Sequence, residues 1–220
     1  FDGTGGSFRL SRMKVMSEPR ILLERFWEAL PLDAALGRLP LAERQRVSIL
    51  RAMARGGRVL LLDEPTAALP RGEARKVLSL VRQAAAKGRI VVYVSHHLEE
   101  VLKVADRILV LRNGQIALDR PAPGCSPADL VLAMLGSRPV GAAAPLAAAP
   151  AVDQDLPAGT GATDAPVPKG GAPLLSLRGF SFLSSSRWSP PLDLGLAPGE
   201  ILGLSGLAGS GKDDLIPAIL

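Results

Sequence analysis

Two adjacent carboxylates, Asp63 and Glu64, follow an unbroken apolar run over residues 59–62. A run of this length that ends in charge is typical of a strand buried on both faces of a parallel sheet. The carboxyl ends of such strands are where α/β sheets place their ligands. One carboxylate can hold Mg²⁺, directly or through water, and the next can orient or deprotonate a water that attacks a phosphate. The alternative is a buried strand that ends in two solvated acids.

A second motif has the spacing G-x-x-x-x-G-K of a phosphate-binding loop, after a predicted short strand at 201–205 and before a predicted helix. Its glycines let backbone N–H groups turn toward phosphate oxygens, and the helix N-terminus adds partial positive charge. Lys212 reaches the terminal phosphates, whereas Asp213 stands where a Ser or Thr hydroxyl should bind Mg²⁺. A glycine-rich turn between strand and helix is the alternative. The predicted loop comprises Gly206, Leu207, Ala208, Gly209, Ser210, Gly211, Lys212 and Asp213.

Several regular elements are expected around these motifs. Residues 70–87 carry apolar side chains at helical spacing, and residues 89–95 form a second buried strand that ends at His96 and His97. Strand, helix and strand of these lengths predict a right-handed βαβ unit. Asn113-Gly114, flanked by residues 107–111 and 115–118, predicts a β-hairpin, and residues 129–135 predict a helix.

Composition excludes several classes of protein. The chain is 47% hydrophobic and 21% charged, which is ordinary for a globular protein. The single cysteine, Cys125, cannot form an internal disulfide framework and fits a reducing compartment. No apolar run reaches the roughly 18 residues that a membrane span needs.

The net charge of +5 arises entirely within residues 1–60, which hold 11 Lys and Arg against 6 Asp and Glu. The rest of the chain holds 15 of each sign. A basic surface of this kind is either a nucleic-acid interface or a solvated helical face. We favour the solvated face and do not expect a nucleic-acid partner.

The expected domain organisation follows from a change in composition at residues 137–173. Ala, Pro and Gly dominate this segment without periodicity, which predicts a linker rather than a packed unit. A Pro-rich recognition segment is the alternative. The chain begins at Phe1 and stops at Leu220 inside a predicted helix, so we expect an internal piece of a longer protein. The expected units are residues 1–136 and 174–220, joined by the linker.

In this order the motifs resemble those of ATP-binding-cassette (ABC) ATPases. R-V-L-L-L-D-E-P-T-A-A-L, residues 58–69, is similar to the Walker B strand and D-loop, and V-Y-V-S-H-H, residues 92–97, to the strand that ends in the switch histidine. L-P-L-A-E-R-Q occupies the place of the L-S-G-G-Q signature. The residues at that place are Leu39, Pro40, Leu41, Ala42, Glu43, Arg44 and Gln45.

The junction resembles that of carbohydrate-importer ATPases with two cassettes on one chain. M-L-G-S-R, residues 134–138, is similar to the end of the first cassette, and G-E-I-L-G-L-S-G-L-A-G-S-G, residues 199–211, to the start of the second. The resemblance implies an α/β P-loop NTPase fold, with a mostly parallel sheet flanked by helices and a helical subdomain. Residues 1–136 would be the C-terminal part of one nucleotide-binding domain, and 174–220 the N-terminal part of another, both incomplete.

The resemblance also implies roles for residues. ATP and Mg²⁺ would be the cofactors, with Asp63 and Asp213 as metal ligands. Glu64 would position the attacking water, and His96 would contact the γ-phosphate, although a core histidine is the alternative for His96. Because each site of the family pairs one cassette's P-loop with the other's signature, the loop 206–213 should face residues 39–45. On this interpretation the chain contains no complete site.

The implied function is ATP hydrolysis that drives import of a sugar or similar small solute. The partners would be integral-membrane permease subunits, indirectly an extracytoplasmic solute-binding protein, and the second cassette of the same chain. The location would be the cytoplasmic face of the cell membrane, as a peripheral protein. Two alternatives stay open: a cassette ATPase that acts on ribosomes or DNA without a membrane partner, and a non-catalytic remnant.

Overall fold

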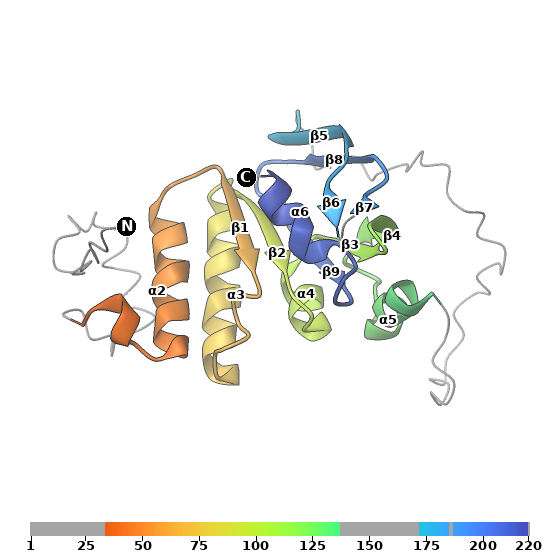
Figure 1. Ribbon diagram of the computed structural model, residues 1–220. Coiled ribbons are helices and arrows are strands. Elements are labelled where there is room, and N and C mark those ends of the chain that lie inside the picture. Colours follow the sequence, from red (N-terminus) through yellow and green to blue (C-terminus); the bar gives the residue numbers. More distant parts are fainter. Residues whose placement is uncertain (1–33, 137–171, 185–186, 220) are drawn as a thin grey trace, which may run out of the picture.

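The computed structural model describes residues 34–136, 172–184 and 187–219 (Figure 1). The predicted linker falls almost wholly outside these residues, as does the first quarter of the predicted first unit up to residue 33. The elements before residue 137 are η2 (Leu36–Arg38), α2 (Leu41–Ala54), β1 (Val59–Asp63), α3 (Arg71–Ala86), β2 (Ile90–Val94), α4 (Leu98–Val104), β3 (Arg107–Arg112), β4 (Gln115–Pro121) and α5 (Pro127–Leu135). Those after residue 171 are β5 (Leu175–Phe180), β6 (Leu183–Ser184), β7 (Arg187–Trp188), β8 (Leu192–Leu196), β9 (Ile201–Gly206) and α6 (Lys212–Ile219).

The main sheet has five strands in the order β1-β2-β9-β3-β4. β1, β2, β9 and β3 run parallel, and β4 joins the edge antiparallel through the hairpin at Asn113-Gly114. Asn113 and Gly114 have φ angles of 53° and 76°, as a tight turn between right-twisted strands requires. The predicted mixed α/β fold, with a mainly parallel sheet flanked by helices, is thereby confirmed.

Alternate residues of each strand enter two different cores. On one face, Leu62, Tyr93 and Val110 pack with apolar side chains of α2, α3, α4 and α5. On the other face, Val94 and Leu204 pack with Leu192, Leu194 and Leu196 of β8 and with Leu215 and Ile216 of α6. The sheet is therefore covered on both sides, which explains why its parallel strands read as continuous apolar runs.

The central strand, β9, comes from the second predicted unit, although its neighbours β2 and β3 come from the first (Figure 1). All six residues of β9 are buried. Gly203 faces α4, where a Cβ would lie 2.5 Å from Val101 Cγ1 and 2.9 Å from the Ala105 Cβ. The described parts of the two units thus build one sheet. Their division into two separate, incomplete domains stays a prediction about a longer protein.

A buried ion-pair cluster also joins the two segments. The guanidinium of Arg107 on β3 donates to both carboxylate oxygens of Asp119 on β4 and to the carbonyl oxygen of Gly195 on β8. Its Nη1 lies 3.8 Å from Glu200 Oε1, just before β9. Arg107 is 4% exposed, and such a charge is tolerated in the interior only when its donors are satisfied.

The remaining predicted elements form with small shifts at their ends. α5 begins two residues before the predicted helix, because Ser126 caps it, Pro127 occupies the first turn, and Asp129 completes the capping box. Among the residues that the structure describes, no helix combines the length and apolar character needed to cross a bilayer.

The close approach of β9 to α4 yields a stability prediction. Gly203→Ala should lower the free energy of unfolding by about 1–3 kcal/mol, because the new methyl group overpacks the contact with Val101 and Ala105. Gly195→Ala is the matched control, since a Cβ there would meet only Pro173 at 3.7 Å. Urea unfolding followed by circular dichroism measures both. Equal stability of the two variants would show that β9 does not pack under α4.

Candidate functional site

The glycine-rich loop between β9 and α6 adopts backbone conformations that favour glycine. Gly209 and Gly211 have φ angles of 76° and 95°, which residues other than glycine rarely adopt. A Cβ on Gly211 would lie 3.1 Å from the ring of Phe182, and one on Gly206 would lie 2.6 Å from the Leu111 carbonyl oxygen. The glycines therefore let the loop sit tightly against the sheet while its backbone curves.

The β3–β4 hairpin braces this loop from the side. The backbone N–H of Gly114 donates to the carbonyl oxygen of Ser210 at 2.9 Å. The Ser210 hydroxyl is buried without a hydrogen-bond partner in the described residues, and it packs against Gly206 inside the loop. The hairpin was predicted from its turn residues, but its contact with the loop was not, because nothing in the local sequence signals it.

Lys212, the first residue of α6, is 6% exposed and lies between two carboxylates. Its Nζ donates to Asp213 Oδ1 at 2.7 Å and to Glu64 Oε1 at 3.3 Å. Burial disfavours the charged ammonium, but the hydrogen bonds and charges of Asp213 and Glu64 outweigh it and raise the pKa of Lys212. Lys212 is therefore a fixed cation at the mouth of the loop.

Glu64 links the loop to the end of β2. Its Oε1 accepts from the backbone N–H of His96 at 3.1 Å, and its Oε2 lies 2.8 Å from His96 Nδ1. The φ of Glu64 is +43°, a conformation that costs a non-glycine residue of order 1–3 kcal/mol. Its backbone N–H donates to the Val94 carbonyl oxygen at 2.9 Å, which helps to hold this conformation.

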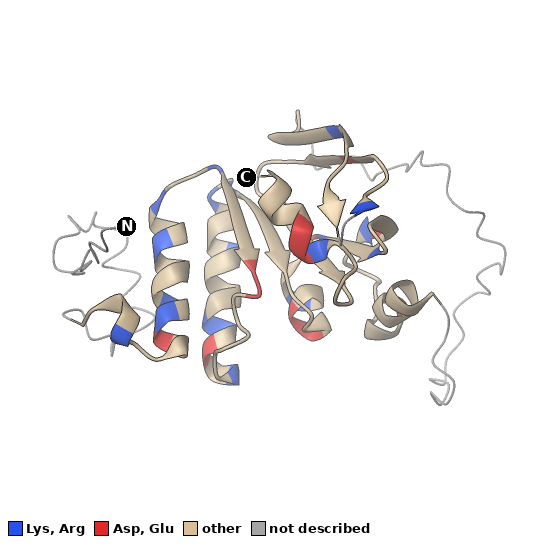
Figure 2. Cartoon of the chain, in the orientation of Figure 1, with Lys and Arg blue, Asp and Glu red and all other residues tan. Residues whose placement is uncertain are grey.

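Asp63 ends β1 beside Glu64, with an exposed side chain. Partial desolvation and the negative charges of Asp213 and Glu64 raise its pKa, although Lys212 acts in the opposite direction. Figure 2 shows acidic positions at the end of β1 and in the first turn of α6, close to the lysine that begins this helix. Carboxylates that share one positive side chain can accommodate a further cation.

The carboxylates beside the loop fit Mg²⁺ bound together with a polyphosphate better than they fit the metal alone. Asp63 and Asp213 supply the hard oxygen ligands that Mg²⁺ prefers. In the described part of the chain, no three His, Cys, Asp or Glu side chains form a group that could hold a metal by itself. Mg²⁺ commonly binds through one or two carboxylates and completes its coordination with substrate phosphates and water.

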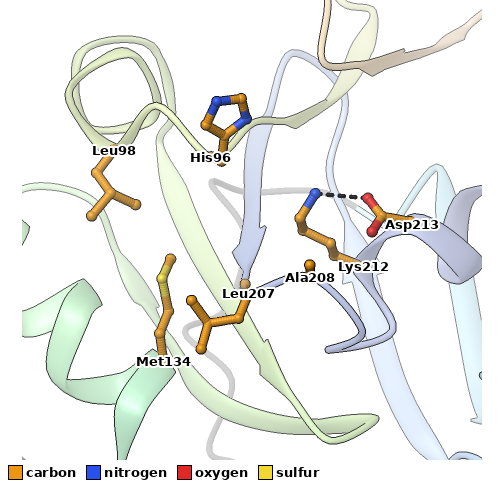
Figure 3. Close-up of a pocket in the computed structure, with 8 residues that line it drawn as sticks. His96, Leu98, Met134, Leu207, Ala208, Lys212 and Asp213 are labelled. Carbon is orange, nitrogen blue, oxygen red and sulfur yellow. Dashed lines mark hydrogen bonds and ion pairs between the residues drawn. The ribbon is translucent and has the colours of Figure 1, made fainter.

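A pocket of about 290 Å³ opens beside the loop (Figure 3). Leu98, Met134 and Leu207 lie on one side of it, and Lys212 and Asp213 lie on the other. The pocket is lined by His96, Leu98, Met134, Gly206, Leu207, Ala208, Lys212 and Asp213. The polar members were predicted, whereas Leu98 and Met134 were not, because in the sequence they read only as the apolar stripes of two helices.

The structure does not bring residues 39–45 together with the loop 206–213. Residues 41–45 form the first turn of α2, with Pro40 at its N-cap, and α2 packs on the opposite face of the sheet from α6. Leu41 is 61% exposed. Gln45 instead donates to the Pro65 carbonyl oxygen at 3.2 Å and reaches that of Glu64 at 3.5 Å.

That the chain contains no complete site stays a prediction. The loop itself lies beside Glu64, which Lys212 contacts, and beside His96, with which it lines one pocket. The physical reason is the position of β9 between β2 and β3, which puts its carboxyl end beside those of β1 and β2. Parallel strands end at a common edge, so residues far apart in sequence converge there.

A buried hydroxyl network behind Glu64 was also missed. Tyr93 and Thr66 both donate to Glu100 Oε2, at 2.7 Å and 2.6 Å. Burial raises the pKa of Tyr93 far above its ordinary value, so the hydroxyl remains a donor. Within an apolar strand, Tyr93 looks like a core residue, and sequence alone does not reveal that it shares Glu100 of α4 with Thr66, which belongs to the segment after Glu64.

The chain is similar in sequence to ribose import ATP-binding proteins. No protein-family model matches the chain. The ribose import ATP-binding protein RbsA 2 of Mesorhizobium japonicum is 35% identical over 184 residues, which is 84% of this chain and 32% of that protein. The corresponding protein of Pseudomonas putida is 34% identical over 91% of this chain and 35% of its own length. RbsA 3 of Rubrobacter xylanophilus is 33% identical over 99% of this chain and 39% of its own length.

The chain thus spans about a third of the length of these curated relatives. Among solved structures, one described as an inward-facing ABC transporter of metal-chelate type is 21% identical. It aligns with a TM-score of 0.48 over 62% of each chain.

The hydroxyl network yields a testable prediction. Tyr93→Phe should lower the free energy of unfolding by about 1–3 kcal/mol, because the partly buried Glu100 carboxylate loses a donor. Thr66→Ser keeps the other donor and serves as the control. Chemical denaturation compares the variants, and a Tyr93→Phe protein as stable as the wild type would contradict the role assigned to the network.

Proposed function

We propose that this chain is part of the ATP-binding and ATP-hydrolysing subunit of an ABC importer that energises uptake of a sugar or similar small solute. The observation that carries the proposal is the contact between Lys212 and Glu64, 148 positions apart in sequence and 3.3 Å apart in space. A phosphate-binding lysine and a candidate water-positioning carboxylate thus share one site. The names of the relatives, which are ribose import ATP-binding proteins, support both the nucleotide and the direction of transport.

Each group of the site has a role in the proposed reaction. The loop 206–211 and Lys212 bind the nucleotide phosphates, through backbone N–H groups and one ammonium. Asp63 and Asp213 hold Mg²⁺, which neutralises phosphate charge when it is bound. Glu64 orients the attacking water, and His96 both holds Glu64 and contacts the terminal phosphate. Catalysis of this kind rests on positioning and electrostatics rather than on covalent chemistry.

Residues 39–45 have a different place in the proposal. They lie away from the loop of their own sheet, and Leu41 at the start of α2 is largely exposed. This leaves them available to face the nucleotide of a second cassette, on the same chain or on another. Gln45 would then link that contact to the backbone of Glu64 and Pro65, with which it forms hydrogen bonds.

The partners and location are part of the same proposal. Integral-membrane permease subunits would carry the solute, and an extracytoplasmic solute-binding protein would deliver it. The subunit would be peripheral, on the cytoplasmic face of the membrane. The import function in the relatives' names supports these assignments.

A second candidate is nucleotide binding with little turnover. Asp213 occupies a hydroxyl position and pairs with Lys212, while Pro40 and Ala42 depart from the signature pattern that they resemble. Pro40 offers neither a hydroxyl nor a backbone N–H to a phosphate. Steady-state hydrolysis of ATP by the full-length protein separates this candidate from the first.

The role of Glu64 provides the direct test. Glu64→Gln should retain binding of ATP while its hydrolysis falls by about 10²–10⁴-fold, because the amide cannot act as a base or orient water in the same way. Glu99→Gln makes the same chemical change on an exposed side chain that pairs only with Lys103 among the described residues, and should leave both quantities unchanged. Undiminished hydrolysis in Glu64→Gln would exclude the assignment.

A further inference from the structure

We propose that Asp213 competes with phosphate for Lys212, so that the loop binds a nucleoside triphosphate strongly only when a divalent cation accompanies it. This inference rests on the proposed function and adds to it a condition for binding that this chain's own residues impose.

The first support is the way in which Lys212 is held. Its ammonium is almost fully buried and donates to two carboxylates, Asp213 at 2.7 Å and Glu64 at 3.3 Å. A triphosphate without a metal would have to displace one of them, and it would bring its own negative charge beside both. In a partly buried site such repulsion is screened less than in water.

The second support is an asymmetry between the two carboxylates. Glu64 is also held by His96, through the backbone N–H at 3.1 Å and the ring nitrogen at 2.8 Å. Among the contacts that the structure describes, Asp213 has Lys212 alone, and its side chain is 53% exposed. Asp213 is therefore the partner that can leave Lys212, and a cation that it binds would release the lysine for phosphate.

The third support is the lack of another suitable oxygen in the described loop. The Ser205 hydroxyl is fully buried and donates to the Ser95 carbonyl oxygen at 2.9 Å. The Ser210 hydroxyl is directed into the loop, against Gly206, and the residue is 4% exposed. Neither hydroxyl can reach a cation at the surface of the loop. Asp213 is therefore the loop's side-chain oxygen that meets a cation at the start of α6.

The experiment measures ATP binding to the full-length protein by isothermal titration calorimetry, with Mg²⁺ and with EDTA. Asp213→Ser restores a neutral hydroxyl, and Asp214→Ser removes the same charge from the next residue of α6, which makes no described contact with Lys212. The ratio of affinities with and without Mg²⁺ is the quantity compared, so no variant needs to hydrolyse ATP.

For the wild type we expect Mg²⁺ to raise the affinity for ATP by about 100-fold or more. The repulsion between one close pair of like charges in such a site lowers an affinity by this order of magnitude. In Asp213→Ser the ratio should fall to about tenfold or less, mainly because binding without metal improves. Asp214→Ser should keep the wild-type ratio. Circular dichroism confirms folding, and Asp213→Asn replaces Asp213→Ser if the latter is unstable.

Three results would overturn the inference while leaving the proposed function intact: a wild-type affinity for ATP that is equal with and without Mg²⁺, a ratio unchanged by Asp213→Ser, or an equal change in Asp214→Ser. Absence of ATP binding to the wild type even with Mg²⁺ would instead overturn the proposed function, and this inference with it.

Discussion

The structure depends on the insertion of β9 between β2 and β3. This strand is paired on both edges and buried at every residue, and it contributes to the cores on both faces of the sheet. Gly203 provides the room that α4 needs, and the Arg107 cluster joins β3 and β4 to the residues that precede β9. Without β9 at this position, β2 and β3 would face each other across an unpaired gap, which a sheet interior does not tolerate.

The candidate site follows from the same constraint. Because β1, β2 and β9 are parallel, their carboxyl ends meet at one edge, and each ends in a different chemical group. β1 ends in two carboxylates, β2 is followed by His96, and β9 runs into the loop that carries Lys212. The α2 helix belongs to the other face, so its first turn, in which Leu41 is largely exposed, is separated from this loop.

The sequence predicted the elements well, and their spatial arrangement less well. Asp63, Glu64 and the glycine-rich loop were found because residue type and spacing reflect local chemistry, and β1, β2 and the hairpin at Asn113 were found because apolar runs and turn residues are local signals. The partner of each strand is not local. Nothing within residues 201–206 indicates that they pair with β2 and β3, and the bond from Gly114 to Ser210 depends on that pairing. The bond from Tyr93 to Glu100 depends instead on how α4 packs against β2.

The most direct test of the account is a zero-length carbodiimide cross-link between Lys212 and Glu64, whose Nζ and Oε1 atoms lie 3.3 Å apart. It should be read by mass spectrometry on an equal mixture of unlabelled and ¹⁵N-labelled chains. We expect a Glu64–Lys212 cross-linked peptide pair in which both peptides carry the same label, because both segments belong to one sheet of one chain. Absence of this pair, or its presence only as mixed-label species, would contradict the account.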